Sequence, residues 1–352
     1  MTTRAAIQTE PGGPLIIDEL ALPAPGPDQV AVKLFSSGIC HSQLHGMANA
    51  TRPRPMLLGH EGTGVVVQAG AEVSHVREGD HVIVTWVTRT PLTVPQAMVP
   101  PIAFEYRGQP VFYNHVHTWS EHVVAVAERV VGIAPDVPTD VSCIVGCAVL
   151  TGAGAVLYTA GVRPGDSVAV FGVGGVGLSA LRMAALLEAH PVIAVDLRDD
   201  KLQFARRFGA THTVNAGEVD PVEAITDLTG GGADYAFDTI GVRATAEQIL
   251  DATRPGWIGA HSHGGMAVLV GVPPAEMTLD PRKFMMHQRR YAGSHGASIP
   301  ERDFPMYLRM HAEGRFPLDE LVTDRYRLDQ INEACAALRA GDIMGRAIIE
   351  YD

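Results

Sequence analysis

A six-residue glycine motif constrains the fold of this chain more than any other feature of its sequence. Residues 172–177 read Gly-Val-Gly-Gly-Val-Gly and fit the pattern G-x-G-x-x-G. The motif follows the short apolar run 167–171 and opens the alanine-rich stretch 175–188, whose spaced apolar residues suit a helix. The glycine pattern alone is weak. In the order strand, glycine turn, helix, however, it predicts a βαβ unit that binds a dinucleotide.

The residues of the motif have separate tasks in such a turn. Gly172 allows the tight turn, Gly174 lets the backbone approach a pyrophosphate, and Gly177 lets the helix pack closely on the strand. Backbone N–H groups at the start of the helix then face the phosphates. The candidate dinucleotide-binding residues of the turn are Gly172, Gly174, Gly175, Val176 and Gly177.

An acidic residue follows at the end of the second predicted strand, 192–195. Asp196 can accept hydrogen bonds from the adenosine ribose, and its charge repels a 2′-phosphate, so it favours NAD over NADP. Arg198 lies close by and could weaken that preference. The alternative interpretation is a glycine-rich turn beside an exposed aspartate, with no bound nucleotide.

Strands and helices continue to alternate after the motif. A helical stretch covers residues 200–208, with Gly209 placed to end it, and three further strands are expected near Val214, at 235–237 and at 268–270. This alternation predicts an α/β domain with a doubly wound parallel sheet. Before it, residues 1–146 contain short Val/Ile runs bounded by Gly and Pro, which predict mostly β-strands, for example at 29–34, 64–67 and 81–84. After it, a helix is expected at 328–340 and a last strand at 346–349.

The length and net charge of the chain limit the classes of protein to which it can belong. A chain of 352 residues is long enough for about two domains. Its net charge of −12 argues against nucleic acid or an anionic membrane as partner, and no apolar run is long enough for a membrane span. The first residues lack the apolar core of a secretory signal. Four cysteines in a chain of this size fit reduced thiols in the cytoplasm better than disulfides.

Candidate metal ligands are dispersed along the chain. Cys40, His60 and Cys147 could supply the three protein ligands of a catalytic zinc, since two thiolates and one imidazole form a known set that leaves one position open. Spacing alone does not select these residues, because the sequence has neither C-x-x-C nor H-E-x-x-H. Without other information, Cys147 would be an ordinary buried cysteine and His60 a histidine at a strand end.

The combination of motifs resembles the zinc-containing alcohol dehydrogenases of the medium-chain dehydrogenase/reductase superfamily. The likeness rests on Gly59-His60-Glu61-Gly62-Thr63-Gly64 with Gly70, on residues 38–42 and 232–238, on Val270-Gly271-Val272 and on the dinucleotide motif, all in the order of that family. It extends over nearly the whole chain. It implies a GroES-like, mostly-β catalytic domain (1–150 and 291–352), interrupted by a Rossmann domain (151–290), with the active site in the cleft between them.

The resemblance also implies roles for individual residues. Cys40, His60 and Cys147 would hold one zinc per chain, with Glu61 as an acid that approaches the metal during ligand exchange. Ser42 and His45 would relay the proton of the alcohol while its hydride passes to NAD. His41, Thr151 and Val270 would lie near the cofactor, and Trp86 would line the substrate pocket. A homo-oligomer, either a dimer or a tetramer, is expected.

Three departures from the family pattern stand out. Residues 87–116 contain no cysteine, so we expect apolar packing in place of the family's structural zinc, and we expect His115, His117 and His122 to be solvated or core histidines. Gln43 stands where the family usually has an aspartate beside the ligand histidine. Residues 257–264 form an extra loop that could border the cofactor cleft.

Two other functions stay open at this point. A zinc-independent quinone or enone reductase could use the same fold, although it would not need Cys40, His60 and Cys147 together. A nucleotide-binding regulatory protein that has lost catalysis would be expected to show a damaged relay or ligand set. For a dehydrogenase, primary alcohols and aldehydes, aromatic or medium-chain, are the expected substrates. Glutathione-linked formaldehyde oxidation is the less favoured alternative.

Overall fold

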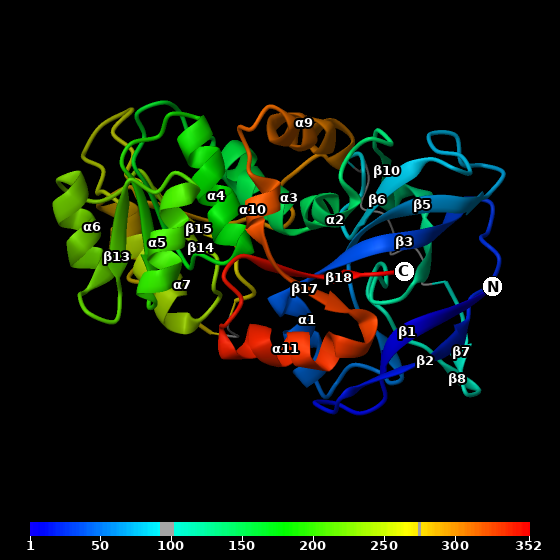
Figure 1. Ribbon diagram of the computed structural model, residues 1–352. Helices are drawn as coiled ribbons and strands as arrows, with labels where there is room; N and C mark the ends of the chain where they lie inside the picture. Colours follow the sequence, from blue (N-terminus) through cyan, green and yellow to red (C-terminus); the bar gives the residue numbers. More distant parts are fainter. Residues whose placement is uncertain (92–101, 274–275) are drawn as a thin grey trace. The chain divides into compact units, whose positions relative to one another are not determined.

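Two compact units make up the chain. The computed structural model describes residues 1–91, 102–273 and 276–352. The first unit contains Met1–Cys147 and Ile299–Asp352, and the second contains Ala148–Ser298 (Figure 1). Residues 92–101 of the cysteine-free segment 87–116 lie outside the described residues.

The first unit is built on a seven-stranded mixed sheet. Its strand order is β10-β6-β5-β3-β18-β17, with β9 also paired to β3. The strands are β3 (Gln29–Ile39), β5 (Glu61–Ala69), β6 (His81–Thr85), β9 (His122–Val126), β10 (Val130–Gly132), β17 (Val322–Arg327) and β18 (Arg346–Glu350). Alternate valines of these strands are fully buried in one cluster, among them Val30 and Val32 of β3 and Val82 and Val84 of β6. The residues between them, such as Ala31 and Ile83, are also fully buried, so both faces of these strands are covered.

Smaller sheets complete the β part of the first unit. One has the order β2-β1-β4, with β1 (Thr2–Gln8), β2 (Leu15–Ala21) and β4 (Met56–Leu57), and another is the hairpin β7 (Glu105–Tyr106) with β8 (Gln109–Pro110). Phe104, Tyr106 and Tyr113 join Ile7 and Leu20 in one buried cluster. Residues 102–113 of the cysteine-free segment therefore pack through aromatic and aliphatic side chains.

Short helices connect the strands of the first unit. They are α1 (His41–Ala48), the 3₁₀ turn η1 (Ala127–Arg129), α2 (Thr139–Ser142), the 3₁₀ turn η2 (Cys143–Gly146), α9 (Pro300–Ala312), α10 (Leu318–Leu321), the 3₁₀ turn η4 (Leu328–Gln330) and α11 (Ile331–Ala340). The predicted helix at 328–340 is thus a 3₁₀ turn followed by α11. Gly341, with a φ of 80°, ends α11 in the left-handed conformation that glycine adopts at little cost.

The second unit is a parallel α/β domain. Its six-stranded sheet has the order β13-β12-β11-β14-β15-β16. The strands are β11 (Val168–Phe171), β12 (Val192–Asp196), β13 (His212–Asn215), β14 (Tyr235–Asp238), β15 (Met266–Leu269) and β16 (Arg290–Gly293). The strand order reverses at β11, because β12 and β13 extend the sheet on one side and β14, β15 and β16 on the other. Ligands bind at such a reversal in open α/β sheets.

Helices follow most strands of this sheet. They are α3 (Ala148–Gly154), continued by the π-helix η3 (Ala155–Ala160), α4 (Gly175–Leu186), α5 (Asp199–Arg207), α6 (Pro221–Thr229), α7 (Arg243–Asp251) and α8 (Arg282–Met285). Each predicted strand and helix of this region is present. The predicted class, α/β with a mostly-β domain and a doubly wound parallel sheet, is confirmed.

One strand of the second unit was not predicted. β16 pairs with β15 in parallel register, from Met266 opposite Arg290 to Leu269 opposite Gly293. Its sequence, Arg-Tyr-Ala-Gly, has none of the β-branched residues that mark strands, because an edge strand buries less surface than a central one. This strand carries the second unit on to Ser298, whereas the predicted boundary at 290/291 cuts β16.

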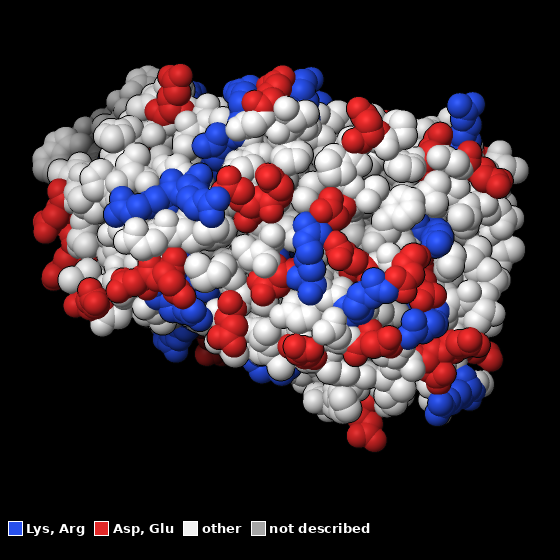
Figure 2. Space-filling model, viewed as in Figure 1, with Lys and Arg blue, Asp and Glu red and all other residues white. Residues whose placement is uncertain are grey.

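Two properties of the described residues concern possible partners: the charges on the surface and the length of the apolar helices. On the face drawn in Figure 2, acidic and basic side chains are interspersed. Within the described ranges, no single helix has the length and apolar character needed to cross a membrane. One bent pair, Thr139–Gly146 with Ala148–Ala160, meets that test by length and composition alone.

Candidate active site

Three buried donor atoms converge in the first unit. The imidazole Nε2 of His60 lies 3.1 Å from the Cys147 Sγ, and that sulfur lies 3.9 Å from the Cys40 Sγ. All the donor atoms of this group lie within 4.8 Å of one another, and all three residues are buried. Two thiols and one imidazole at these separations fit zinc with one coordination position left open. The residues that the resemblance placed around a zinc are therefore brought together.

Local backbone geometry sets these donors in place. Cys40 follows the end of β3 and is the N-cap residue of α1, and Cys147 follows the 3₁₀ turn η2. Gly59, just before His60, has a φ of +90°, and a Cβ there would lie 2.4 Å from the backbone nitrogen of Trp119. Only glycine fits this turn, which explains the glycine that precedes the ligand histidine.

Helix α1 carries the predicted proton relay. Ser42 donates a hydrogen bond from Oγ to the Cys40 Sγ over 3.3 Å. His45 lies three residues further along the same helix and is exposed, as is His41, whose ring centroid is 5.4 Å from that of His45. The relay residues therefore run from the metal ligands to the surface of the unit. Trp86, the predicted pocket residue, lies edge-on to His60 with ring centroids 6.4 Å apart.

Glu61 makes a buried ion pair that the sequence analysis missed. The Arg346 guanidinium donates a hydrogen bond to Glu61 Oε1, and both side chains are almost fully buried. The other carboxylate oxygen, Oε2, has no hydrogen-bond partner among the described residues. Gly38 makes room for this carboxyl group, since a Cβ there would lie 2.4 Å from the Glu61 Cδ. The only local signal was a charged residue, Arg346, directly before the three apolar residues of strand β18.

The charges of this site shift the pKa values of its groups. A hydrogen bond from Cys147, with the positive charge of Arg346 and contact with His60, holds the pKa of the Cys40 thiol well below its usual range despite burial. Burial raises the pKa of Glu61, although Arg346 opposes the shift. Burial would lower the pKa of Arg346, but the charges of Glu61 and the two cysteines outweigh it and raise that pKa. Arg346 therefore remains charged and favours thiolate at Cys40.

Gln43 joins helix α1 to the ligand histidine. Its Oε1 accepts a hydrogen bond from the Gly59 backbone N–H over 2.8 Å. Its Nε2 contacts the Nδ1 of His60. The residue that departs from the family pattern is thus in direct contact with a candidate zinc ligand.

The glycine motif of the second unit has the geometry of a phosphate-binding turn. Gly172 directly follows β11 and has a φ of +88°, and a Cβ on Gly177 would lie 1.9 Å from the Gly172 carbonyl oxygen. A Cβ on Gly174 would meet no atom within 4 Å, so open space adjoins the backbone where a pyrophosphate would approach. Gly175 and Val176 form the first turn of α4. These observations fit a dinucleotide.

Other predicted cofactor residues lie at the same sheet or beside it. Asp196 ends β12, and its Oδ2 accepts a hydrogen bond from the Val173 N–H over 3.0 Å, which ties it to the glycine turn. Val270 follows β15 and donates its N–H to the Asp238 carbonyl over 2.9 Å. Thr151 lies in α3 of the same unit, and its buried Oγ1 has no partner within the described part of the chain. An orphaned hydroxyl of this kind suits a bound ligand.

The three histidines near the cysteine-free segment differ in environment. His115 is exposed and His122 is half-buried. His117 is fully buried beside the stacked rings of Phe104 and Tyr113, each with its centroid 5.3 Å from that of His117. Burial lowers the pKa of His117 to about 3, so it is neutral at physiological pH. The one group of His, Cys or acidic residues able to hold a metal among the described residues is the Cys40 group.

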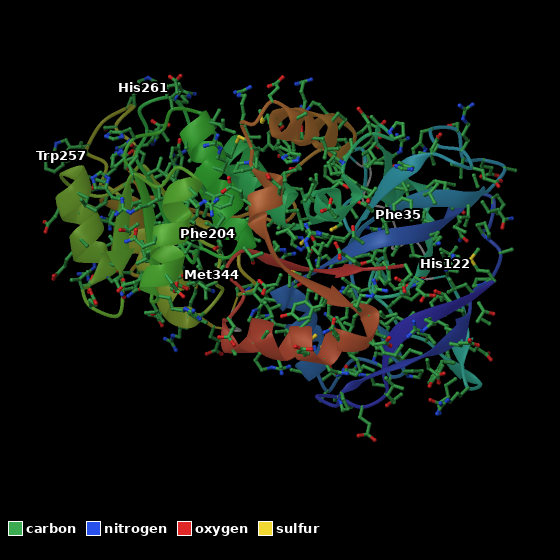
Figure 3. The ribbon with its side chains drawn as sticks, viewed as in Figure 1. Phe35, His122, Phe204, Trp257, His261 and Met344 are labelled. Atoms are coloured by element: carbon green, nitrogen blue, oxygen red, sulfur yellow. The ribbon has the colours of Figure 1, made fainter. Side chains whose placement is uncertain are left out.

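The extra loop at 257–264 is exposed. Trp257 and Ile258 expose 75% and 87% of their surface, and the side chains of Trp257 and His261 point outward (Figure 3). The Gly256 N–H donates to the His287 carbonyl over 2.6 Å, so the loop is anchored beside the segment that leads into β16. Its position relative to the cofactor stays a prediction.

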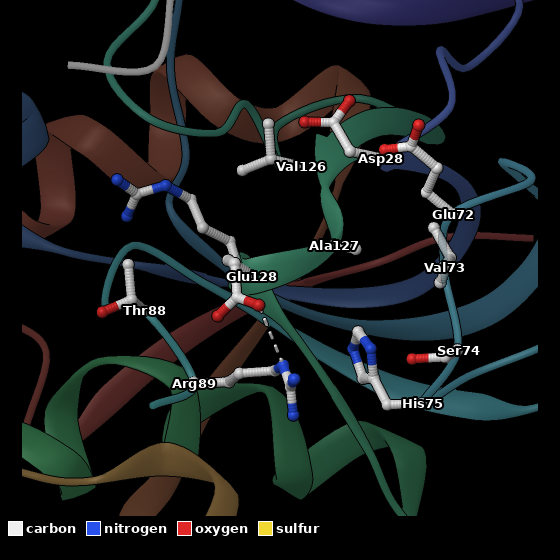
Figure 4. A pocket seen from close by; sticks show the side chains of 11 residues that line it. Asp28, Glu72, Val73, Ser74, His75, Thr88, Arg89, Val126, Ala127 and Glu128 are labelled. Carbon is white, nitrogen blue, oxygen red and sulfur yellow. Dashed lines mark ion pairs between the residues drawn. The ribbon is translucent and has the colours of Figure 1, made fainter. Parts of the chain in front are cut away.

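A surface cavity of about 190 Å³ in the first unit contains none of the predicted site residues. In its lining, Arg89 forms an ion pair with Glu128 (Figure 4) and another with Glu301. It is lined by Asp28, Glu72, Val73, Ser74, His75, Thr88, Arg89, Val126, Ala127, Glu128 and Arg129. We assign no chemistry to it, because the candidate donors and nucleophiles lie elsewhere.

Two known protein families match the chain, one mainly in each unit. The model of the alcohol dehydrogenase GroES-like domain matches residues 26–136, and the model of the zinc-binding dehydrogenase domain matches residues 175–313. The chain is similar to an alcohol dehydrogenase class-3 of Cereibacter sphaeroides, with 33% identity over 99% of this chain and 100% of the relative. It is equally similar to an S-(hydroxymethyl)glutathione dehydrogenase of Paracoccus denitrificans, with 33% identity over the full length of both.

Solved structures resemble the whole chain. A benzyl alcohol dehydrogenase from Acinetobacter calcoaceticus is 28% identical, covers 100% of both chains and has a TM-score of 0.90. An alcohol dehydrogenase zinc-binding domain protein from Burkholderia ambifaria is 30% identical, with a TM-score of 0.89 over 100% of this chain and 99% of its own.

Proposed function

The chain belongs to the zinc-dependent alcohol dehydrogenases of the medium-chain dehydrogenase/reductase superfamily, and from that premise we propose how its residues transfer a hydride between an alcohol and NAD. The observation that carries the proposal is the buried set of Cys40, His60 and Cys147, whose donor atoms lie within 4.8 Å of one another. A zinc-independent reductase would have no use for this set. We assign the first unit, Met1–Cys147 with Ile299–Asp352, to the catalytic domain and the second unit, Ala148–Ser298, to the dinucleotide-binding domain, in place of the boundaries 150/151 and 290/291 expected from the sequence.

When bound, zinc would lower the pKa of the alcohol hydroxyl and NAD would accept the hydride, which yields the aldehyde or ketone and NADH. Ser42 is assigned to take the hydroxyl proton, because its Oγ lies 3.3 Å from the Sγ of Cys40, one of the three residues that would hold the zinc. His45, exposed on the same helix, passes that proton to solvent. In the reverse direction the same two groups return a proton to the substrate oxygen.

Glu61 is assigned the role of the acid that approaches the metal during ligand exchange. Its Oε2 is buried and has no partner in the described residues, whereas Oε1 is held by Arg346. Arg346 then prevents the carboxylate from being left as an unpaired buried charge. Both residues act on the ligand set and not on the substrate directly.

The second unit supplies the cofactor site in this proposal. The turn from Gly172 to Gly177 receives the pyrophosphate, and Asp196 accepts hydrogen bonds from the adenosine ribose. In this proposal Thr151 is assigned to the nicotinamide, Val270 to the bound cofactor and His41 to the pyrophosphate. The open space at Gly174 and the orphaned Thr151 hydroxyl support these assignments.

We assign primary alcohols and aldehydes, aromatic or medium-chain, as the substrates. Trp86 beside His60 presents an aromatic wall to the zinc site, and the solved benzyl alcohol dehydrogenase resembles the chain over its full length. The S-(hydroxymethyl)glutathione dehydrogenases that are 33% identical make the glutathione adduct of formaldehyde the competing substrate. NADH formation with benzyl alcohol, a medium-chain alcohol and that adduct separates the two. A higher kcat/KM with the adduct would contradict our assignment.

We further propose that the protein is a cytoplasmic homo-oligomer, a dimer or a tetramer. All four cysteines are free thiols, which suits a reducing compartment. Trp257, Ile258, Met285 and Met286 form an apolar patch, between 58% and 87% exposed, beside the edge strand β16. A second copy could cover this patch by a two-fold contact.

Sedimentation velocity tests the assembly. Replacing Trp257 and Ile258 together by serine is expected to shift the protein to a smaller species. The control Leu228→Ser, in α6 beside the opposite edge strand β13, removes a 40%-exposed apolar side chain and is expected to leave the size unchanged. An unchanged size in the double variant would contradict the contact.

The zinc content of cysteine variants tests the mechanism. Cys40→Ser is expected to abolish turnover and to lower bound zinc well below one per chain, because it removes one of three ligands. The matched control is Cys335→Ser, a buried cysteine in a separate core cluster of the same unit. It is expected to keep its zinc. Full turnover in a metal-free preparation would refute the proposal in favour of the zinc-independent reductase.

A further inference from the structure

The side chain of Gln43 contacts two consecutive residues, Gly59 and the candidate zinc ligand His60. Its amide oxygen accepts from the Gly59 backbone N–H over 2.8 Å, and its amide nitrogen contacts the His60 Nδ1. The two atoms of the amide are therefore used at two separate places. Because Gly59 and His60 are consecutive, this one side chain orients both the turn and the imidazole ring.

The partners of Gln43 can be counted as donors and acceptors. The Nε2 of His60 faces the thiols, 3.1 Å from the Cys147 Sγ, so it is the nitrogen that binds the metal. A neutral imidazole that binds through Nε2 carries its proton on Nδ1, which then acts as a donor. The Gly59 N–H is also a donor. Two donors thus face an amide that offers a single acceptor atom.

Turning the amide over does not remove this mismatch. With Oε1 on Gly59, the amide N–H meets the Nδ1–H of His60. With Oε1 on His60, the amide N–H meets the Gly59 N–H instead. In either orientation one buried or half-buried donor is left without an acceptor, which is unfavourable. A carboxylate at the same place would accept at both oxygens.

We propose that Gln43 is a positioning residue that satisfies only one of these two donors, and that it thereby holds the zinc affinity of this chain below the affinity that a carboxylate at this place would give. The inference rests on the proposed function in taking His60 as a zinc ligand. Mutating the hydrogen-bond partner of a metal-bound histidine typically changes metal affinity about 10- to 100-fold. Gln43 acts through His60 and the Gly59 turn and does not touch the substrate.

Gln43→Glu is the isosteric test, because it places a second acceptor oxygen where Nε2 now lies. We expect its zinc dissociation constant, measured by competition with a chromogenic chelator, to fall about 10- to 100-fold below that of the unaltered chain. A carboxylate also adds negative charge near the metal, so a charge control is needed. Ala48→Glu adds the same charge to the exposed end of helix α1, and we expect it to change the zinc affinity by less than about threefold, because exposed charges are strongly screened.

Two spectroscopic measurements separate this role from a general structural effect. In zinc-loaded Gln43→Glu, nitrogen-15 NMR is expected to show a protected Nδ1–H on His60, and the Gly59 amide is expected to remain protected from hydrogen exchange. In the zinc-loaded unaltered chain, one of the two protons is expected to exchange faster. Protection of both protons in the unaltered chain would overturn the inference, and so would equal affinities of Gln43→Glu and Ala48→Glu.

The outcomes also separate this inference from the proposed function. If the unaltered chain binds one zinc and Gln43→Glu binds it no tighter than the charge control, only the role of Gln43 is refuted. If the unaltered chain binds no zinc, or if its zinc is unaffected by Cys40→Ser, the proposed function fails and the role of Gln43 fails with it.

Discussion

The burial of His117 makes the stability of the first unit sensitive to acid. Its ring packs beside the stacked rings of Phe104 and Tyr113, its Nδ1 contacts the Ser120 hydroxyl, and burial lowers its pKa from 6.5 to about 3. The unfolded chain binds a proton at this histidine below about pH 6.5, whereas the folded chain does not until about pH 3. Stability from neutral His117 is therefore fully present above about pH 6.5 and is lost as the pH falls toward about 3.

The size of the loss follows from the two pKa values. Protonation of the unfolded chain alone lowers the free energy of unfolding by about 2 kcal/mol at about pH 5 and by about 3 kcal/mol at about pH 4. His117→Asn removes the titrating group and keeps a polar atom near Ser120. We expect this variant to be less stable near neutrality, because a cavity replaces the ring. We also expect it to lose about 2 kcal/mol less than the unaltered chain between about pH 7.5 and about pH 5.

Urea unfolding followed by tryptophan fluorescence measures this difference. Acid also weakens metal binding by cysteine and histidine, but that effect is common to the unaltered chain and the variant and cancels in the comparison. His115→Asn is the matched control, because His115 is exposed and only two residues away. It is expected to follow the unaltered chain. Equal losses in His117→Asn and the unaltered chain would refute the reasoning.

Three further substitutions test other parts of the structure. Gly177→Ala places a Cβ 1.9 Å from the Gly172 carbonyl oxygen, so we expect a loss of about 1–3 kcal/mol by thermal unfolding and weaker NADH binding by fluorescence titration. Arg346→Met leaves Glu61 as a buried, unpaired acid, and we expect a loss of about 3–5 kcal/mol in urea unfolding; an unchanged midpoint would show that the ion pair does not stabilise the fold. Asp196→Gly is expected to raise kcat/KM with NADP relative to NAD, and an unchanged ratio would mean that this carboxylate does not select the cofactor.

Local sequence signals predicted several buried strands of both units, among them β3, β5 and β6 of the first and β11, β12 and β14 of the second. The runs that became β11, β12 and β14 are short, apolar and bounded by turn residues, so neighbouring residues alone identify them. The edge strand β16 was missed for the converse reason: its stability comes from pairing with β15, not from the burial of its own side chains.

Contacts between side chains that are far apart in the sequence were harder to predict than strands and helices. Glu61 and Arg346 are 285 positions apart, and neither residue by itself indicates the other. The mismatch at Gln43 was visible in sequence only as a missing charge. Its meaning depends on which atoms of the amide face Gly59 and His60, and those contacts exist only in the folded chain.

The sequence by itself determined the chemical groups available to this protein: two thiols and an imidazole suited to a metal, a glycine turn proposed to receive a pyrophosphate, and a carboxylate proposed to select the nucleotide. These depend on residue type and on neighbours along the chain. Only the tertiary structure decided that Cys40, His60 and Cys147 meet within 4.8 Å, and that one amide must serve two donors beside them. Coordination and hydrogen bonding act over a few ångströms, and a distance of that kind between residues far apart in the chain is set by packing.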